Sequence, residues 1–266
     1  MKYQLVLLTV LVTLLNSCQK QNDFPVVDVY GHAAQSLHRD RTVFPANSYE
    51  SVQYAIDVLN TEGVEIDIQM TKDSVLVLFH DSYLSESTLM DGCVSQYNYN
   101  ELKDLTLDFT SYKLTTLKSV LELTKSRNVK VYIDAKIYSF CDGKTSISAF
   151  QYALNQSTQN LDSTYKNNVY LGMSDLEFLK SITYPIKCFE SNYIGYSTDQ
   201  ALASNFKAVI FNVNLIGDEE RTFLNNSGLY WGISGIKDKW SIDQSVALKP
   251  KFVITDNISY TLQVTN

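Results

Sequence analysis

Short runs of β-branched and aromatic residues alternate with amphipathic stretches through most of this 266-residue chain. In the amphipathic stretches apolar residues recur at intervals of three and four, as in Val52, Ile56 and Leu59, which is the spacing of a helix face. The expected strands are residues 26–30, 64–70, 75–79, 129–137, 169–173, 186–189, 208–213, 229–233 and 252–255. The expected helices are residues 49–59, 117–125, 147–154, 176–182, 199–204, 219–224 and 242–248. This alternation predicts parallel βα units.

The run at 75–79 is expected to fold back as a hairpin arm, because Thr-Lys-Asp-Ser at 71–74 is a turn signal. Eight βα units then remain, in about 230 residues, which is the size of one (β/α)8 TIM barrel. With 10 Gly and 4 Pro, the chain has no Gly- or Pro-rich linker. We therefore expect an α/β fold with one TIM barrel over residues 26–266. Residues 81–113, rich in Ser, Thr, Asp and Tyr, are expected to elaborate the loop after the second strand, as a candidate lid or insertion.

The first 17 residues have the pattern of a bacterial lipoprotein signal peptide. Lys2 precedes an apolar run from Leu5 to Leu15, and Cys18 directly follows the small residue Ser17. The run is shorter than the roughly 20 residues of a spanning helix. We expect a signal peptide over 1–17, lipidation at Cys18, a tether over 18–25, and an extracytoplasmic position on a bacterial membrane, in the periplasm or at the cell surface. The alternative is an ordinary signal peptide with a cysteine nearby.

Net charge and cysteine content restrict the classes of partner. The formal net charge is −7, whereas binding to duplex nucleic acid calls for a basic face, so we expect no nucleic-acid partner. Cys93, Cys141 and Cys188 remain after Cys18, so at most one disulfide can form among them in an oxidising compartment. None of them shows the spacing of zinc ligands.

Six side chains with catalytic chemistry fall at or near the C-terminal ends of expected strands. They are His32, Glu65, Asp67, His80, Asp134 and Lys136. Glu65 and Asp67 are two residues apart on a strand and therefore point to the same face, as do Asp134 and Lys136. Each feature alone is more typical of a solvated face or a surface ion pair. Since the strand ends of a parallel barrel converge on one site, their combination in one chain predicts a single functional site.

This combination favours phosphoester cleavage. Three converging carboxylates repel one another unless a divalent cation lies between them, and oxygen ligands suit Ca²⁺ or Mg²⁺. Two histidines can supply a general acid and a general base near neutral pH, and a lysine can hold a phosphate oxygen. The sequence has no G-x-S-x-G nucleophile motif, which argues against acyl transfer.

The block from Glu65 to Asp81 resembles the glycerophosphodiester phosphodiesterase family. It contains Glu-Ile-Asp at 65–67 and Val-Leu-Phe-His-Asp at 77–81. Weaker similarities are Tyr-Gly-His at 30–32, Pro-Ala-Asn-Ser at 45–48, Leu-Thr-Thr-Leu at 114–117, Ile-Asp-Ala-Lys at 133–136, Tyr-Trp-Gly-Ile-Ser at 230–234 and Ile-Thr-Asp-Asn at 254–257. Together they extend from about residue 28 to residue 258.

The resemblance implies a phospholipase C-like barrel that hydrolyses glycerophosphodiesters to glycerol 3-phosphate and an alcohol. It implies that Glu65, Asp67 and Asp134 bind the divalent cation and that His32 and His80 are the catalytic pair. Lys136, Asn47 and Trp231 would contact the substrate. For Trp231 a buried place in the core is an equal alternative.

The chain departs from the family pattern in one loop. The pattern His-Arg-Gly is His32-Ala33-Ala34 here, and the family's Glu-Asn pair is Ala46-Asn47. Arg39 or Arg41 is a candidate to replace the missing arginine at the phosphate. Two other functions therefore stay open: a barrel that binds a phosphate ester without turnover, and a metal-independent phospholyase acting on inositol lipids.

Overall fold

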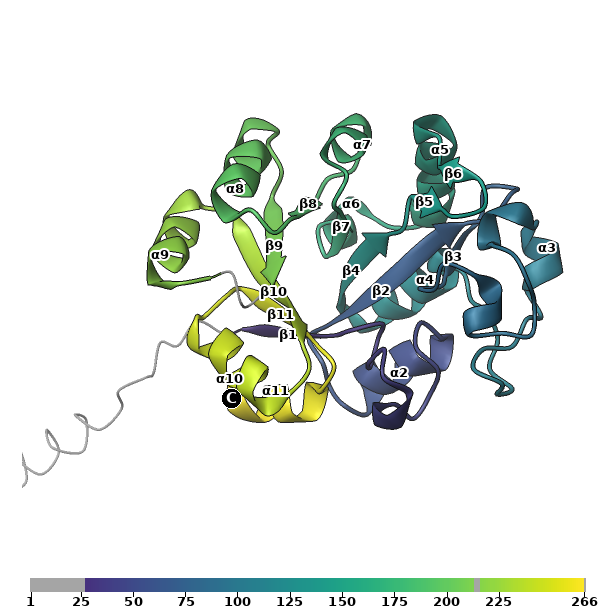
Figure 1. Ribbon diagram of the computed structural model, residues 1–266, viewed down its shortest axis with the longest axis horizontal. Helices are drawn as coiled ribbons and strands as arrows, with labels where there is room; N and C mark the ends of the chain where they lie inside the picture. Colours follow the sequence, from purple (N-terminus) through teal and green to yellow (C-terminus); the bar gives the residue numbers. More distant parts are fainter. Residues whose placement is uncertain (1–26, 213–215, 266) are drawn as a thin grey trace, which may run out of the picture.

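In the described part of the chain, residues 27–212 and 216–265, eight parallel strands close into a barrel, as the sequence predicts (Figure 1). We identified this architecture in a computed structural model. The barrel strands are β1 (Asp28–Gly31), β2 (Gly63–Met70), β4 (Lys130–Ala135), β7 (Val169–Met173), β8 (Lys187–Glu190), β9 (Ala208–Asn212), β10 (Tyr230–Ile236) and β11 (Phe252–Thr255). The ring closes because β1 pairs in parallel with both β2 and β11.

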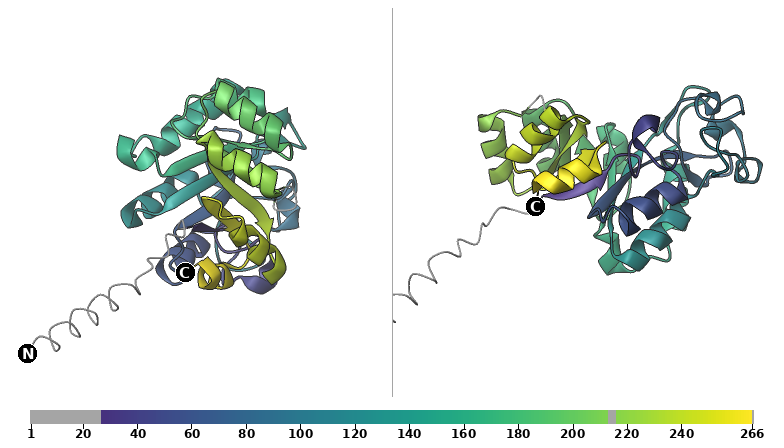
Figure 2. Two further views of the ribbon diagram at one scale, coloured as in Figure 1. Left: turned by 90° about the vertical axis from the view of Figure 1, so that its left-hand side faces the viewer. Right: turned by 90° about the horizontal axis from the view of Figure 1, so that it is seen from below.

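Helices lie outside the strands, as Figures 1 and 2 show. They are α2 (Tyr49–Asp57), α4 (Leu117–Arg127), α5 (Ile147–Thr158), α6 (Ser163–Lys166), α7 (Leu176–Ser181), α8 (Ile194–Ala203), α9 (Asp218–Ser227), α10 (Lys239–Ala247) and α11 (Ile258–Thr265). Several begin at a side-chain cap: Ser48, Thr116, Ser146, Asp175 and Asp238 each accept a hydrogen bond from the backbone three residues on. These caps satisfy backbone donors that the first helical turn leaves free.

Aromatic side chains fill the N-terminal end of the barrel interior. Members of this layer are Tyr30, Tyr132, Tyr170, Tyr230 and Phe252. The rings of Tyr30 and Tyr230 stack on Phe252 with centroids 5.2 and 5.3 Å apart. Gly232 makes room for this packing, since a Cβ there would lie 2.3 Å from Cζ of Phe252. Aliphatic residues on the outward strand faces pack against the helices, so the polar groups are left to the C-terminal end.

The barrel has a short seam between β1 and β2. Only Tyr30 and Gly31 of β1 are in register with residues of β2, whereas six residues of β2 are in register with β4. Beyond the seam, the backbone N–H of Ala33 donates to Oε2 of Glu65 at 2.6 Å, and that of Ala34 donates to the Glu65 carbonyl at 2.7 Å. Glu65 therefore supports closure through both its side chain and its backbone.

The expected hairpin arm is confirmed. Strand β3 (Leu76–Leu78) runs antiparallel to β2, with Leu78 opposite Ile68. The following residues form the expected elaboration, which projects from one side of the barrel and contains the short α3 (Tyr99–Leu102) (Figure 1). It has a small apolar core of its own with β3, made of Val77, Phe79, Leu84, Val94, Leu102, Leu107 and Leu114.

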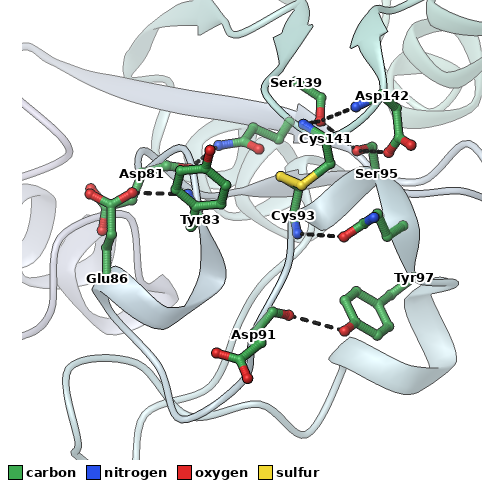
Figure 3. Close-up of a disulfide and its surroundings, with 12 residues drawn as sticks. Asp81, Tyr83, Glu86, Asp91, Cys93, Ser95, Tyr97, Ser139, Cys141 and Asp142 are labelled. Carbon is green, nitrogen blue, oxygen red and sulfur yellow. Dashed lines mark hydrogen bonds between the residues drawn. A yellow bond between two sulfur atoms is a disulfide. The ribbon is translucent and has the colours of Figure 1, made fainter.

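A disulfide between Cys93 and Cys141 joins the elaboration to the loop after β4 (Figure 3). That loop contains the hairpin of β5 (Tyr138–Ser139) and β6 (Gly143–Lys144). Beside the bridge, Oγ of Ser95 lies 2.7 Å from Oγ of Ser139. Cys188 is buried and unpaired, so the expectation of at most one disulfide holds among the described residues.

Three helices around the barrel differ from expectation. The α8 helix begins at Ile194, five residues before the expected start, and neither the short α6 nor α11 was expected. Gly195 and the Tyr- and Thr-rich sequence of α11 have weak helix propensity, and burial of Ile194 and Ile258 stabilises α8 and α11 instead. Within the described residues no helix is both long and apolar enough to span a membrane. The expected signal peptide, Cys18 and tether lie outside these residues.

Candidate active site

Three carboxylates converge at the C-terminal end of the barrel, as the sequence predicts. Glu65 and Asp67 come from β2, and Asp134 comes from the adjacent β4, in register with Asp67. One oxygen of each carboxylate lies within 4.8 Å of the others. Glu65 and Asp67 are 3% and 1% exposed, so their charges are shielded from bulk water. A buried set of three hard oxygen donors fits a divalent cation such as Ca²⁺ or Mg²⁺.

Electrostatic repulsion within this cluster is offset in part by Lys136. Its Nζ lies 3.0 Å from Oδ1 of Asp67 and also contacts Asp134. Burial raises the pKa of Glu65, and the neighbouring charge of Asp67 raises it further. Burial likewise raises the pKa of Asp134, against the opposing effect of Lys136. A divalent cation bound between these carboxylates would stabilise their charged forms.

His32 lies directly after β1 and is oriented by Asp256, which follows β11. Nδ1 of His32 is 3.0 Å from Oδ1 of Asp256. The same carboxylate accepts hydrogen bonds from Oγ of Ser36 at 2.9 Å and from the Leu37 backbone at 3.1 Å. Burial lowers the pKa of His32, but the hydrogen bond to Asp256 and the charge of Glu65 outweigh it and raise that pKa to about 9.

Asp256 was missed as a site residue in the sequence, although it lies directly after the last strand in the Ile-Thr-Asp-Asn segment. Its position at a strand end is the same signal that identified Asp134. His38, in the loop after His32, has Nε2 3.7 Å from Oδ2 of Asp256. The carboxylate of Asp256 therefore anchors the whole loop that carries His32.

The second histidine, His80, lies after the hairpin arm and is paired with the next residue. Its Nδ1 is 3.0 Å from Oδ1 of Asp81, and this hydrogen bond raises the pKa of His80. Asn47 lies between this region and the carboxylates: its Nδ2 donates to Oδ2 of Asp67 at 2.8 Å, and its Oδ1 accepts from the Asp67 backbone at 2.9 Å. Asn47 therefore fixes the Asp67 carboxylate.

Two cavities flank the carboxylates. The cavity called here the polar cavity, of about 410 Å³, is lined by polar side chains that include His32, Glu65, Ser174, Ser191, Asn192 and Ser234, together with the apolar Ile210, Phe211 and Ile254. The aromatic cavity, of about 390 Å³, is lined by His80, Lys136, Ile137, Tyr138, Phe140 and Met173 among others. Asp134, Ser174 and Glu190 border both. A diester with its phosphorus near Asp134 could thus place one substituent in each cavity.

Glu190, at the end of β8, is a further site residue that sequence reasoning missed. It accepts a hydrogen bond from Oη of Tyr132 at 2.7 Å, and burial raises its pKa to about 8. Its place directly after an expected strand, two residues before Asn192, is the signal that could have identified it.

The family model described as "Glycerophosphoryl diester phosphodiesterase family" matches residues 38–204. This chain belongs to that family. Among curated relatives it is 31% identical over 106 residues to a glycerophosphodiester phosphodiesterase of Bacillus altitudinis, covering 36% of this chain and 43% of the relative. A second glycerophosphodiester phosphodiesterase, of Caldanaerobacter subterraneus, is also 31% identical over 106 residues, which cover 37% of this chain and 43% of the relative. The chain thus aligns with less than half the length of these relatives.

Solved structures with the family's names share the barrel. A phosphodiesterase from Oleispira antarctica, in complex with the product sn-glycerol-3-phosphate, superposes with a TM-score of 0.74 at 15% identity, over 90% of this chain and 96% of the other. The glycerophosphodiester phosphodiesterase of Thermotoga maritima gives a TM-score of 0.70 at 19% identity, over 90% and 98%. At these identities the similarity establishes the fold.

The loop after His32 has an unusual backbone. Ala33 and Ala34 both have positive φ, at 47° and 77°, a region in which glycine is the usual residue. Gly31 is required just before them, because a Cβ there would lie 1.9 Å from the Ala34 carbonyl oxygen. The loop therefore keeps a sharply turned backbone with alanine at both positions.

The two candidate replacement arginines have different surroundings. Arg39 borders a small cavity together with Asn47, His80 and Asp81. The guanidinium of Arg39 is held by an ion pair with Asp108 of the elaboration. Arg41 instead donates to the backbone carbonyl of Lys237 and borders a separate cavity with Tyr54 and Asp256. Of the two, only Arg39 shares a cavity with His80.

Trp231 is not a substrate contact. It is fully buried in the layer between strands and helices, and its Nε1 donates to Oδ1 of Asn225 at 3.1 Å. Neither the polar nor the aromatic cavity includes it. As the second residue of β10 it lies at the N-terminal end of its strand and faces outward, so the alternative of a buried place in the core is the correct one and the expected substrate contact is wrong.

Proposed function

We propose that this protein hydrolyses glycerophosphodiesters to glycerol 3-phosphate and an alcohol, with Ca²⁺ or Mg²⁺ bound by Glu65, Asp67 and Asp134. The observation that carries the proposal is the cluster of three carboxylates bordered by His32 in one cavity and by His80 in the other. A pure phosphate-ester binder has no need of two histidines that are each oriented by a carboxylate. The carboxylate cluster argues against a metal-independent phospholyase.

The two histidines carry the proton transfers. One accepts the proton of a glycerol hydroxyl as that oxygen forms a bond to phosphorus, and the other protonates the leaving alkoxide as its bond to phosphorus breaks. Water then opens the cyclic phosphate, which gives glycerol 3-phosphate. The bound cation supplies positive charge beside the phosphate, which stabilises the charge of the transition state. Asp256 holds His32 in position through a hydrogen bond to Nδ1 of the histidine, and Asp81 holds His80 in the same way.

We assign the contacts to the phosphate to two cationic side chains, Lys136 and Arg39. Lys136 is paired with Asp67 and Asp134, and a cation taking over those carboxylates would free its ammonium group for a phosphate oxygen. We assign the part of the missing family arginine to Arg39, because it shares a cavity with His80 and Asn47.

Phosphorus NMR tests the proposed reaction. The purified protein is incubated with glycerophosphocholine, glycerophosphoethanolamine and glycerophosphoglycerol, with Ca²⁺ or Mg²⁺, and compared with a chelator-treated sample and a His80→Ala variant. We expect a glycerol 3-phosphate signal that is lost in both controls, with a cyclic phosphate as a transient. Turnover that persists in chelator refutes the role of the metal, and no turnover of any diester refutes the proposed function.

The arginines provide a matched pair of variants. Arg39→Ala is expected to lower kcat/KM by about 100-fold, the usual order for loss of one transition-state contact, while Arg41→Ala leaves it nearly unchanged. Both side chains are exposed, so neither change should unfold the protein. Equal effects of the two substitutions would contradict the assignment to Arg39.

We further propose that the protein is lipid-anchored through Cys18 and acts outside the cytoplasm. The support is the sequence pattern of residues 1–18 together with the disulfide, which forms in oxidising compartments. Labelling of cells with a radioactive fatty acid should mark the wild-type protein and not a Cys18→Ala variant. An unlabelled wild-type protein recovered in the soluble extracytoplasmic fraction would favour an ordinary signal peptide.

A further inference from the structure

The aromatic cavity has a charged floor and an apolar outer wall. His80, Asp134 and Lys136 lie at the floor, where they belong to the site described above. Ile137, Tyr138, Phe140 and Met173 form the wall. Ile137 and Met173 are buried, whereas Tyr138 and Phe140 are 66% and 67% exposed. Two exposed aromatic rings beside a catalytic centre are unfavourable in water unless a ligand covers them.

This wall is rigidly supported. Tyr138 lies on β5 and Phe140 begins the turn of the β5–β6 hairpin, and both line the aromatic cavity. Cys141 follows Phe140 directly and is bonded to Cys93, so the backbone of this segment is covalently fixed to the elaboration (Figure 3). The ring of Tyr83, from the elaboration, lies 6.0 Å from that of Phe140. A wall held in this way loses little conformational freedom when a ligand binds.

Two of the three acids that line the aromatic cavity are paired with a lysine. Asp175 contacts Lys144 and Asp134 contacts Lys136, whereas Glu190 accepts a hydrogen bond from Tyr132 and lies where the two cavities meet. The outer wall itself consists of Ile137, Tyr138, Phe140 and Met173 and carries no acid. An uncharged, apolar group therefore fits this wall better than a cationic one.

The polar cavity on the other side of Asp134 holds a cluster of hydroxyl and amide groups beside the apolar side chains of Ile210, Phe211 and Ile254. The hydroxyl and amide groups of Ser174, Ser191, Asn192 and Ser234 match a polyol such as glycerol. The two cavities meet at Asp134, Ser174 and Glu190, so the substituents of one phosphodiester can occupy both. With glycerol in the polar cavity, the leaving alcohol enters the aromatic cavity and its oxygen faces His80.

We propose that Tyr138 and Phe140 form a subsite for the apolar body of the leaving alcohol, so that the protein prefers glycerophosphodiesters whose alcohol carries an alkyl chain. This inference rests on the proposed function and specifies its substrate class. The P–O bond to the alkyl alcohol breaks, and the alkoxide takes its proton from His80. Tyr138 and Phe140 determine specificity and take no part in the proton transfers.

A series of substrates tests the subsite. Kinetics are measured for glycerol 3-phosphate esters of ethanol, butanol and octanol, with glycerophosphocholine as the charged comparison. We expect kcat/KM to rise about twofold to fourfold for each added methylene group over the shorter members, the range for partial to full burial of a methylene. In a Tyr138→Ser/Phe140→Ser variant the ratio of octyl to ethyl ester should fall by at least tenfold. Tyr152→Ser, an equally exposed aromatic on α5, serves as the control and should keep the wild-type ratio.

A binding measurement separates failure of the subsite from failure of the proposed function. Calorimetry with ethyl, butyl and octyl phosphate needs no turnover, and affinity should rise along this series in the wild type only. Tighter binding of longer chains without hydrolysis of any ester would refute the proposed function and leave the apolar subsite standing. The subsite would be refuted if kcat/KM did not change with chain length in the wild type. It would also be refuted if kcat/KM rose with chain length equally in the double variant. A preference for glycerophosphocholine over every alkyl ester would also overturn it.

Discussion

Loss of the Cys93–Cys141 disulfide should cost a large part of the stability of this protein. The two cysteines are 48 residues apart, and the closed loop contains α4 and β4, which belong to the body of the barrel. The bridge therefore constrains a central part of the unfolded chain and not only a surface hairpin. For a loop of this length the chain-entropy relation gives about 4 kcal/mol at 25 °C, so a Cys93→Ala/Cys141→Ala variant should be less stable by about that amount.

Urea denaturation followed by circular dichroism measures the effect. The variant and the reduced wild-type protein should unfold at similar urea concentrations, both well below the oxidised wild type, and the variant should not respond to reductant. A Cys188→Ala variant is the control, because the buried Cys188 thiol forms no disulfide and the Cys93–Cys141 bridge remains in this variant. A loss of less than 1 kcal/mol, or a wild-type transition that does not move with reductant, would refute the reasoning.

Three further predictions concern the site and its frame. In protein kept free of divalent cations, the raised pKa of His32 (about 9, against 6.5 unfolded) should stabilise the fold by about 3 kcal/mol below pH 6.5, and this should be lost as pH rises through 9. Urea titrations at pH 6 and pH 10 check it, and Asp256→Asn should remove most of the difference. Gly31→Ala should destabilise the protein by about 3 kcal/mol in thermal unfolding, since its Cβ would overlap the Ala34 carbonyl oxygen. Trp231→Phe should cost about 1–3 kcal/mol of stability with kcat/KM within twofold of wild type; a large loss of activity at full stability would return Trp231 to the site.

The barrel was predictable because its strands are buried on both faces. A strand such as β9 then appears in the sequence as a nearly continuous apolar run, Ala-Val-Ile-Phe, and helices with one apolar face fall between such runs. The weakly periodic α11 was missed because its Tyr and Thr residues have no helical preference of their own. It forms by packing against the barrel, which a local pattern does not encode.

The site was predictable where two functional residues share a strand. Glu65 and Asp67 are two residues apart, and so are Asp134 and Lys136. This spacing predicts that the two side chains of each pair point to the same face. Asp256 and Glu190 reach the site from the ends of strands far along the chain. Their roles depend on hydrogen bonds to His32 and Tyr132, partners that only the folded barrel brings near them.

Glu65 has a consequence for how activity data on this protein must be read. Its carboxylate is placed to bind a cation, yet the same group accepts the Ala33 N–H beside the shortest strand pairing of the barrel. A substitution at this position changes the chemistry and loosens the ring at once, so an inactive Glu65 variant does not report on metal binding alone. Asp134, which has no such bond to the seam among the described contacts, is the better residue for separating the two effects. A residue that replaces Glu65 must accept the hydrogen bond of the Ala33 N–H and also keep an oxygen in the carboxylate cluster.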